Sequence, residues 1–192
     1  MKHKGKQTRS RETIQTILAA ACQVLIDRGY EKTTTNHIAE HSGYSVGTLY
    51  QYFEDKEDIY SEVVDQAISN LIGAAADCPV HDTLENTLQH LLHRMLQALE
   101  RNPALIQSIE GLLVGQFRDK REAAFEALVN SISRLLEPHK DEIAVTDLEL
   151  AAGILVGATE GLTNNIKIRQ LNHEDLETHA LRLQLAYLTM EL

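Results

Sequence analysis

Proline and cysteine are scarce in this sequence of 192 residues, and each scarcity excludes a class of protein. Three prolines leave long uninterrupted stretches rich in Ala, Leu, Glu and Gln, which favours an all-α fold over one built on sheets and turns. The two cysteines, Cys22 and Cys78, are too few for a disulfide framework, so we expect a protein of the reducing cytoplasm.

Long apolar runs are absent as well. The longest run, around residues 151–158, is far shorter than the roughly 20 apolar residues that cross a bilayer. The basic N-terminus is not followed by the apolar core of a signal peptide. We therefore expect a soluble, cytoplasmic protein with no membrane partner.

The negative charge of the chain, −10 in total, is unevenly distributed. Residues 1–30 carry six basic and two acidic side chains, whereas residues 61–192 carry 10 basic and 20 acidic ones. A basic N-terminal end attracts the phosphates of nucleic acid, and an acidic remainder repels them. The distribution favours a protein that meets DNA with its N-terminal part only.

Helical periodicity and capping residues divide the chain into about nine helices. A disordered basic arm of nine residues is expected before the first helix. Asp55 is the expected N-cap of the fourth helix, and Thr146–Glu149 has the pattern of a capping box that opens the eighth. The expected helices cover residues 10–28, a short segment from Thr34, and residues 46–53, 56–76, 83–100, a segment from 103, 119–137, 146–165 and 172–190.

The segment of residues 34–56, TTNHIAEHSGYSVGTLYQYFEDK, has the pattern of a helix-turn-helix. Ile38 and Ala39 mark the inner face of its first helix, and Leu49 and Phe53 mark the inner face of its second. Gly43 lies where the chain reverses, a position that favours a positive φ. The residue after the turn, Ser45, is a good N-cap, and the outward-facing remainder is Val46, Gly47, Thr48, Tyr50, Gln51 and Tyr52.

On these residues, the stretch from about Arg11 to Val64 resembles the DNA-binding domain of the tetracycline-repressor (TetR) family of bacterial transcriptional regulators. The string GTLYQYFEDKEDIY is similar to the recognition-helix signature of that family. The resemblance implies an all-α homodimeric repressor, with residues 1–55 as a helix-turn-helix DNA-binding domain and residues 56–192 as a helical domain for effector binding and dimerisation. The C-terminal two thirds resembles no particular subgroup.

The resemblance also implies which residues contact double-stranded DNA. Phosphate contacts are expected from Thr35, Thr48, Tyr50, Tyr52 and Lys56, and a base contact from Gln51. Many relatives have a basic or polar residue in place of Val46, so base reading in this chain leans more on Gln51, Asn36 and apolar contacts. The expected DNA-contacting set is Thr35, Asn36, Ser45, Val46, Gly47, Thr48, Tyr50, Gln51, Tyr52 and Lys56.

Plainer interpretations of single residues stay open at this point. Tyr50 could belong to the core with only its hydroxyl outside, and Lys56 could be an ordinary exposed lysine in an acidic helix start. Thr34 is expected to be a helix cap rather than a DNA contact. The least expected alternative is a helical hairpin that binds no DNA.

Three glycines, Gly153, Gly157 and Gly161, recur every four residues on the expected eighth helix. Each costs about 1 kcal/mol relative to alanine in a helix, so their alignment suggests that another helix approaches closely. The resemblance implies that the last two helices pair across a two-fold axis, with Leu181, Leu185 and Leu188 in the interface. The alternative is that the glycine face packs within the subunit or lines a ligand cavity.

The resemblance further implies a small-molecule effector, and the apolar character of the middle helices favours an apolar or amphipathic one. Candidate contacts are His90, Met95, Gln107, Glu110 and Phe117, with plain core packing as the alternative for each. The nine histidines are not spaced as three or four converging metal ligands, so we expect neither a metal nor a cofactor.

These observations favour a ligand-responsive, DNA-binding repressor acting on a near-palindromic operator. A ligand-blind DNA-binding regulator with a filled core is the alternative. An enzyme in the C-terminal part is not expected, because no nucleophile–base pair, phosphate-binding loop or metal cluster stands out in the sequence.

Overall fold

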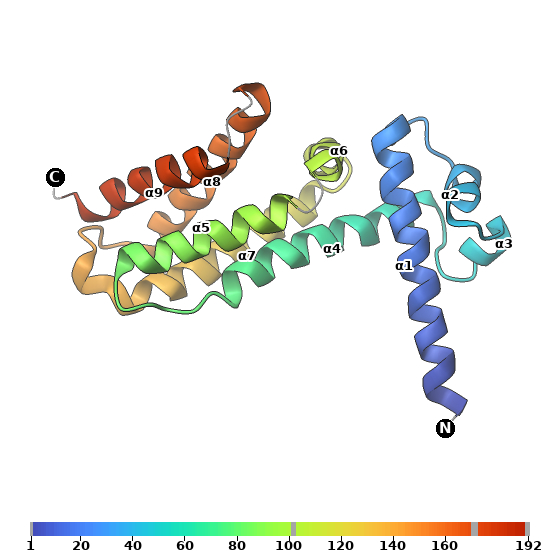
Figure 1. Ribbon diagram of the computed structural model, residues 1–192, viewed down its shortest axis with the longest axis horizontal. Helices are drawn as coiled ribbons and strands as arrows, with labels where there is room; N and C mark the ends of the chain where they lie inside the picture. Colours follow the sequence, from blue (N-terminus) through green and yellow to red (C-terminus); the bar gives the residue numbers. More distant parts are fainter. Residues whose placement is uncertain (1, 101–102, 170–172, 191–192) are drawn as a thin grey trace. The chain divides into compact units, whose positions relative to one another are not determined.

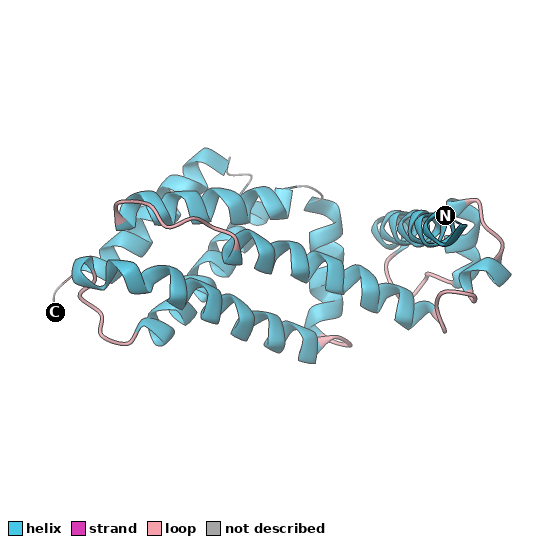
Figure 2. Ribbon diagram, turned by 90° about the horizontal axis from the view of Figure 1, so that it is seen from below, coloured by secondary structure: helices cyan, strands magenta, loops and turns pink. Residues whose placement is uncertain are grey.

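The computed structural model describes residues 2–100, 103–169 and 173–190, with side chains for residues 10–99, 108–161 and 174–190. Within these ranges the chain forms nine α-helices and one 3₁₀ helix, with no strand (Figures 1 and 2). The expected all-α fold is therefore confirmed. No helix in the described ranges has the length and apolar character needed to cross a membrane.

The helices follow the chain in an order close to the expected one. Their bounds are α1 Lys2–Arg28, α2 Thr35–Ser42, α3 Val46–Leu49, α4 Lys56–Ala76, α5 Leu84–Glu100, α6 Pro103–Val114, α7 Arg118–Leu136, the 3₁₀ helix η1 Glu137–Glu142, α8 Leu148–Arg169 and α9 His173–Thr189.

Four boundaries differ from the sequence-based expectation. The expected basic arm is helical from Lys2, because Lys, Gln and Arg continue an existing helix at little cost. Helix α3 ends at Leu49 rather than Phe53, and α8 extends to Arg169 rather than to about residue 165. The expected capping box at Thr146–Glu149 is wrong, since the carboxylate of Asp147 accepts from the backbone N–H of Leu150 and caps α8 instead.

Two compact units divide the chain. The first comprises residues 1–68 and 102–120, and the second comprises residues 69–101 and 121–192. The boundary expected after residue 55 divides the chain by function, into a DNA-binding part and an effector-binding part. This functional boundary stays a prediction.

The core of the first unit forms around α1. Helix α2 packs against α1, and α3 packs against α2 (Figure 1). The apolar stripe of α1 is buried as its spacing predicts, and Gly29 ends the helix with a φ of 72°. The hydroxyl of the fully buried Tyr60 donates to the carbonyl of Ala21 at 3.1 Å, and burial raises the pKa of that phenol to about 12. Helix α6 adds Ile109, Leu112 and the following Phe117 to the same core.

The second unit has a separate core. Helix α9 packs beside α5 and α8 (Figure 1), and apolar side chains of α5, α7, α8 and α9 meet inside. Its most deeply buried members include Leu84, Leu88, Leu136, Ala151 and Leu188.

Candidate nucleic-acid interface

Local capping fixes the start of α2 and the direction in which its first residues point. The hydroxyl of Thr34 accepts from the backbone N–H of His37, while Nδ1 of His37 accepts from the backbone N–H of Thr34, each at 3.3 Å. This reciprocal pair confirms that Thr34 is a cap. Thr35 and Asn36 follow in the first turn, half-buried and exposed respectively.

The turn after α2 is also fixed by local chemistry. Gly43 has a φ of 73°, in the left-handed region that glycine reaches without steric cost. The hydroxyl of Ser45 then accepts from the backbone N–H of Thr48 at 3.1 Å and caps α3. Leu49 and Phe53 are buried in the first core, as their spacing predicts.

Helix α3 is shorter than expected, because its last turn tightens after Leu49. Tyr50 is the C-cap, and the next two backbone N–H groups bond three residues back, from Gln51 to Thr48 and from Tyr52 to Leu49. The residues expected on a longer helix therefore lie on a turn that continues the same outer surface.

The ten residues expected to contact DNA lie on three adjoining segments of the first unit: the first turn of α2, α3 with its following turn, and the first residue of α4. Tyr50 is 55% exposed, which excludes the core position considered for it. Val46 and Tyr52 are half-buried and pack on the first core with part of their side chains. The exposed members are Asn36, Ser45, Gly47, Tyr50 and Gln51, and the half-buried ones are Thr35, Val46, Thr48, Tyr52 and Lys56.

A side-chain hydrogen bond links the two helices of the motif. The hydroxyls of Thr35 and Tyr50 lie 3.3 Å apart, although the residues are 15 positions apart in the sequence. On the neighbouring side of α3, the hydroxyls of Ser45 and Thr48 lie 2.9 Å apart. Four hydroxyl groups are thus held in place without being buried, and each keeps hydrogen-bonding capacity for a further partner.

Gly47 is exposed and has no packing reason to be glycine. A Cβ atom built there would meet only the hydroxyl of Ser45, at the ordinary contact distance of 3.7 Å. Because glycine disfavours a helix by about 1 kcal/mol relative to alanine, the fold alone does not account for this residue.

Lys56, at the start of α4, is held by the turn that follows α1. Its Nζ donates to the backbone carbonyl of Tyr30 at 3.0 Å and lies 4.1 Å from the centre of the Tyr30 ring. Asp55 caps α4 as expected, accepting from the backbone N–H of Asp58 at 2.9 Å. The lysine is therefore not the free surface side chain that the plainer interpretation describes.

Several exposed apolar residues of the second unit lie on α8, on α9 and directly after α9. On α8, Leu150 and Ile154 are 59% and 42% exposed, and Gly157 and Gly161 continue the same line at helical spacing. On α9, Leu183 is 48% exposed, and Met190, the residue directly after the end of α9, is 61% exposed. We call these two lines of residues the α8–α9 face.

The residues expected in a dimer interface divide into two groups. Gly157 and Gly161 face open space, since a Cβ on either would meet no described atom within 4 Å, whereas a Cβ on Gly153 would contact Val129 and Phe125 at 3.8 and 3.9 Å. Leu181 and Leu185 are half-buried on the second core. Leu188 is fully buried within its own chain, so its expected place in an interface is wrong. The Leu188 side chain lies on the inner side of α9, which the spacing of the leucines alone does not reveal.

The expected effector-binding residues are spread over both units, and their role in binding stays a prediction. Met95 is buried in the second core and Phe117 in the first. His90 is half-buried with its ring 4.9 Å from that of His81, Glu110 is half-buried, and the side chain of Gln107 lies outside the described residues.

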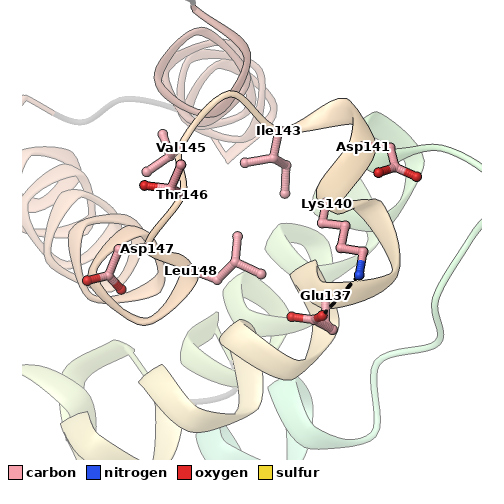
Figure 3. Close-up of a pocket in the computed structure, with 8 residues that line it drawn as sticks. All are labelled: Glu137, Lys140, Asp141, Ile143, Val145, Thr146, Asp147 and Leu148. Atoms are coloured by element: carbon pink, nitrogen blue, oxygen red, sulfur yellow. Dashed lines mark ion pairs between the residues drawn. The ribbon is translucent and has the colours of Figure 1, made fainter.

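Two open hollows lie on the second unit, and none of the expected effector residues lines them. The larger, of about 720 Å³, surrounds the loop between η1 and α8, where Lys140 pairs with Glu137 at 3.8 Å (Figure 3). The other, of about 440 Å³, runs between α7 and α8 beside Phe125, Leu150 and Ile154.

A polar network around the buried His139 was not foreseen from the sequence. Nε2 of His139 lies 2.9 Å from the hydroxyl of Thr87, and its Nδ1 lies 2.8 Å from the carboxylate of Glu142. That carboxylate also accepts from the backbone N–H of Leu84 and so caps α5 from a distant segment. The order carboxylate, imidazole, hydroxyl is that of a nucleophile triad, but Thr87 is fully buried and out of reach of a substrate. The network therefore ties η1 to α5.

No three of the described His, Cys, Asp and Glu side chains converge in a way that could hold a metal ion.

Comparison with known proteins accounts for both units. Residues 17–63 match the model of the bacterial regulatory proteins of the tetR family, and residues 83–188 match the model of the tetracyclin repressor-like C-terminal domain. The first match includes all ten candidate DNA-contacting residues, and the second includes the whole of α5 and α7.

Curated relatives and solved structures agree with these models. The transcriptional repressor BepR of Brucella suis is 41% identical over 56 residues, which are 29% of this chain and 27% of the relative. The transcriptional activator FasR of Mycolicibacterium smegmatis is 27% identical over 143 residues, 69% of this chain and 65% of the relative. The chain thus spans less than two thirds of the length of either. A structure of a TetR-family regulator from Mesorhizobium loti superposes with a TM-score of 0.75 at 25% identity, covering 95% of this chain and 99% of that one. The chain therefore belongs to the TetR family of bacterial DNA-binding transcriptional regulators.

Proposed function

We propose that this protein is a homodimeric repressor that binds a near-palindromic operator through α3 and is released by a small, largely apolar effector. The observation that carries the DNA-binding part is the outer surface of the helix-turn-helix. Its hydroxyls are held in place but not buried, and an unexplained glycine lies among them. A surface of this kind suits phosphates and base edges rather than a second core.

The proposed contacts fall into two groups. Hydroxyl groups of Thr35, Thr48, Tyr50 and Tyr52, together with the Lys56 ammonium, bind phosphates and fix the register of the protein on the duplex. Asn36 and Gln51 read base edges, Ser45 and Val46 begin the helix that enters the groove, and Gly47 lets the backbone approach closely.

Two variants separate these roles. Lys56→Met keeps the side-chain stem but removes one charge, so it is expected to weaken binding to every DNA sequence and to reduce the slope of log K against log salt by about 0.9. Gln51→Ala is expected to relax preference at one base-pair position instead. A uniform loss for Gln51→Ala would contradict its role in base reading.

The proposed dimer pairs the α8–α9 face of two copies. Exposed leucine, isoleucine and methionine beside exposed glycines form an apolar surface onto which a second helix pair can pack closely. Ile154→Glu is expected to convert dimers to monomers in light scattering, because it places a charge on this face. The matched control is Val80→Glu, which changes an equally exposed apolar residue in the loop before α5. A monomeric wild-type protein, or dimers that survive Ile154→Glu, would contradict the proposed interface.

We propose that the protein represses transcription. Its relatives include both a named repressor and a named activator. The C-terminal part matches a domain model named after the tetracyclin repressor, and because tetracycline is a small molecule, this match supports a small-molecule effector. A ligand-blind regulator is the second candidate, and it is favoured by the burial of Met95 and Phe117 in filled cores. Release of a labelled operator by members of a panel of apolar compounds would support the effector, and retention of the operator throughout the panel would favour the ligand-blind regulator.

A further inference from the structure

The turn that joins α6 to α7, residues 115–117, makes a specific contact with the turn that follows α1. The side-chain amide of the exposed Gln116 donates to the hydroxyl of Tyr30 at 2.7 Å, across 86 residues of sequence. Both residues belong to the first unit. The next residue, Phe117, is buried in the core of that unit, so the amide starts from a fixed point of the backbone.

Tyr30 in turn holds the Lys56 side chain at two places. Its carbonyl accepts from Nζ at 3.0 Å, and its ring lies under the ammonium with 4.1 Å between Nζ and the ring centre. The Tyr30 ring also makes an edge-to-face contact with the Tyr60 ring, with 5.3 Å between the two ring centres, and the Tyr60 hydroxyl donates to the carbonyl of Ala21. The Tyr30 ring is therefore located by the core on one side and by Gln116 at its tip.

The surroundings of Lys56 make this placement consequential. Four acidic residues, Glu54, Asp55, Glu57 and Asp58, lie within two positions of it in the sequence. Asp55 and Asp58 are engaged as caps with backbone N–H groups. A long, flexible lysine among carboxylates can adopt many positions, and the Tyr30 ring and carbonyl select one of them.

The Tyr30 hydroxyl is uncharged at physiological pH, and it accepts the hydrogen bond from the Gln116 amide. Burial has the largest effect and raises the pKa of the phenol. The Gln116 hydrogen bond lowers this pKa by less, and the carboxylates of Glu57, Asp55 and Glu31 each raise it by a still smaller amount. The link between Gln116 and Tyr30 is thus a hydrogen bond between two uncharged groups, and it adds orientation without adding charge to a surface that meets DNA.

We propose that Gln116 is a positioning residue for DNA binding, which holds the Tyr30 ring so that the Lys56 ammonium faces a DNA phosphate. The inference rests on the proposed phosphate contact of Lys56. It assigns a role in DNA affinity to a residue outside the helix-turn-helix and outside the matched DNA-binding model, which ends at residue 63.

The test measures binding of a labelled duplex, recovered from a random library by selection with the wild-type protein, at several salt concentrations. Gln116→Ala is expected to weaken binding roughly two- to tenfold, which is the effect of one lost neutral hydrogen bond. Tyr30→Phe keeps the ring and the carbonyl but removes the hydroxyl, so it should have the same effect. The double variant should be no weaker than either single one.

The decisive comparison uses the Lys56→Met background, in which Gln116→Ala should have no further effect on affinity. Gln97→Ala is the matched control, because it removes another exposed glutamine amide with a single side-chain partner, His93 at 2.9 Å, in the second unit. Thermal midpoints should stay close to wild type for Gln116→Ala and Gln97→Ala, since both side chains are exposed.

Three outcomes would overturn the inference, and they are distinguishable. If Gln116→Ala binds DNA like the wild type while Lys56→Met binds it more weakly, the phosphate contact of Lys56 stands and the positioning role of Gln116 is excluded. An equal loss for Gln116→Ala with and without Lys56 means that the glutamine acts by another route. An unchanged affinity and salt slope for Lys56→Met would overturn the phosphate contact itself, and the positioning role with it.

Discussion

The hydroxyls of Thr35 and Tyr50 lie 3.3 Å apart and join the first turn of α2 to the C-cap of α3. Thr35 follows directly on the capped Thr34, so its position is fixed by the start of α2. The Tyr50 ring is more than half exposed, and only its tip is tied down. The pair thus orders an outward-facing aromatic side chain before any DNA is bound, which lowers the entropy lost on binding.

We expect this ordering to be measurable at Tyr50. Tyr50→Phe removes the hydroxyl and should cost about 1 kcal/mol of DNA binding, roughly fivefold in Kd, with little effect on unfolding. Tyr50→Ala also removes the ring and should weaken binding further. The two Kd values are compared by fluorescence anisotropy on the selected duplex, and a wild-type affinity for Tyr50→Ala would contradict the proposed contact.

Gly47 offers a test in which stability and function change in opposite directions. Gly47→Ala adds a methyl group that meets no close neighbour in the chain, so it should stabilise the protein by up to about 1 kcal/mol. The same methyl group should obstruct the approach of α3 to DNA and weaken binding. Gly73→Ala in α4 is the control, because a Cβ there meets nothing within 4 Å.

Urea unfolding and DNA binding are measured for both glycine variants. The account predicts a gain in stability for each variant and a loss of affinity for Gly47→Ala alone. If Gly47→Ala binds DNA as well as the wild type, close backbone approach at this residue is excluded.

The buried His139 network predicts an acid-sensitive contribution to stability. The hydrogen bond from His139 lowers the pKa of the Glu142 carboxyl, and the backbone N–H of Leu84 lowers it further. A carboxyl whose folded pKa is depressed stabilises the fold above its unfolded pKa, and this contribution disappears as the pH falls through the folded pKa. As the pH falls below 4.5, the ordinary pKa of glutamate, the protein should therefore lose stability, and part of that loss should come from Glu142.

Glu142→Gln tests that contribution. The thermal midpoint of the variant should be lower than that of the wild type at neutral pH, and the two midpoints should converge as the pH falls below the usual glutamate range. Glu137→Gln, which removes a carboxylate 3.8 Å from Lys140 on the same 3₁₀ helix, is the control. A constant difference between Glu142→Gln and wild type at all pH values would contradict the assignment.

Gln184 is buried between α8 and α9 with half of its amide unsatisfied. Its Nε2 donates to the hydroxyl of Thr159 at 3.0 Å, while its Oε1 is buried with no hydrogen-bond partner among the described residues. Leaving a buried acceptor unpaired costs on the order of 1–3 kcal/mol, so Gln184→Met should stabilise the protein in urea unfolding. A marked destabilisation would mean that the amide has a partner in solution.

Much of the fold could be predicted because the relevant signals are local. The stripe of α1, the left-handed Gly43, and the caps Thr34, Ser45 and Asp55 each depend on residues within about one helical turn, and the structure confirms them. The end of α3 was missed because Tyr50 and Gln51 are compatible with a longer helix, whereas the backbone N–H groups of Gln51 and Tyr52 bond three residues back.

Contacts between distant segments could not be predicted in this way. Gln116 and Tyr30 are 86 residues apart, and Thr87 and His139 are 52 apart, so no periodicity connects them. The inward direction of Leu188 depends on how α9 is rotated against α5, which the spacing of its leucines leaves open. The sequence identified the candidate DNA-contacting residues on the outer surface. The structure added the contacts that hold two of them, the hydrogen bond between Thr35 and Tyr50 and the one from Lys56 to the carbonyl of Tyr30.

We propose that two copies of this chain read a DNA sequence together through α3. Selection from a random duplex library with the purified full chain tests it most directly. The account predicts a near-palindromic site whose half-sites are centred one helical turn, about 34–36 Å, apart, with preference relaxed at one position of each half-site by Gln51→Ala. Recovery of unrelated sequences, or of a single asymmetric half-site, would contradict it.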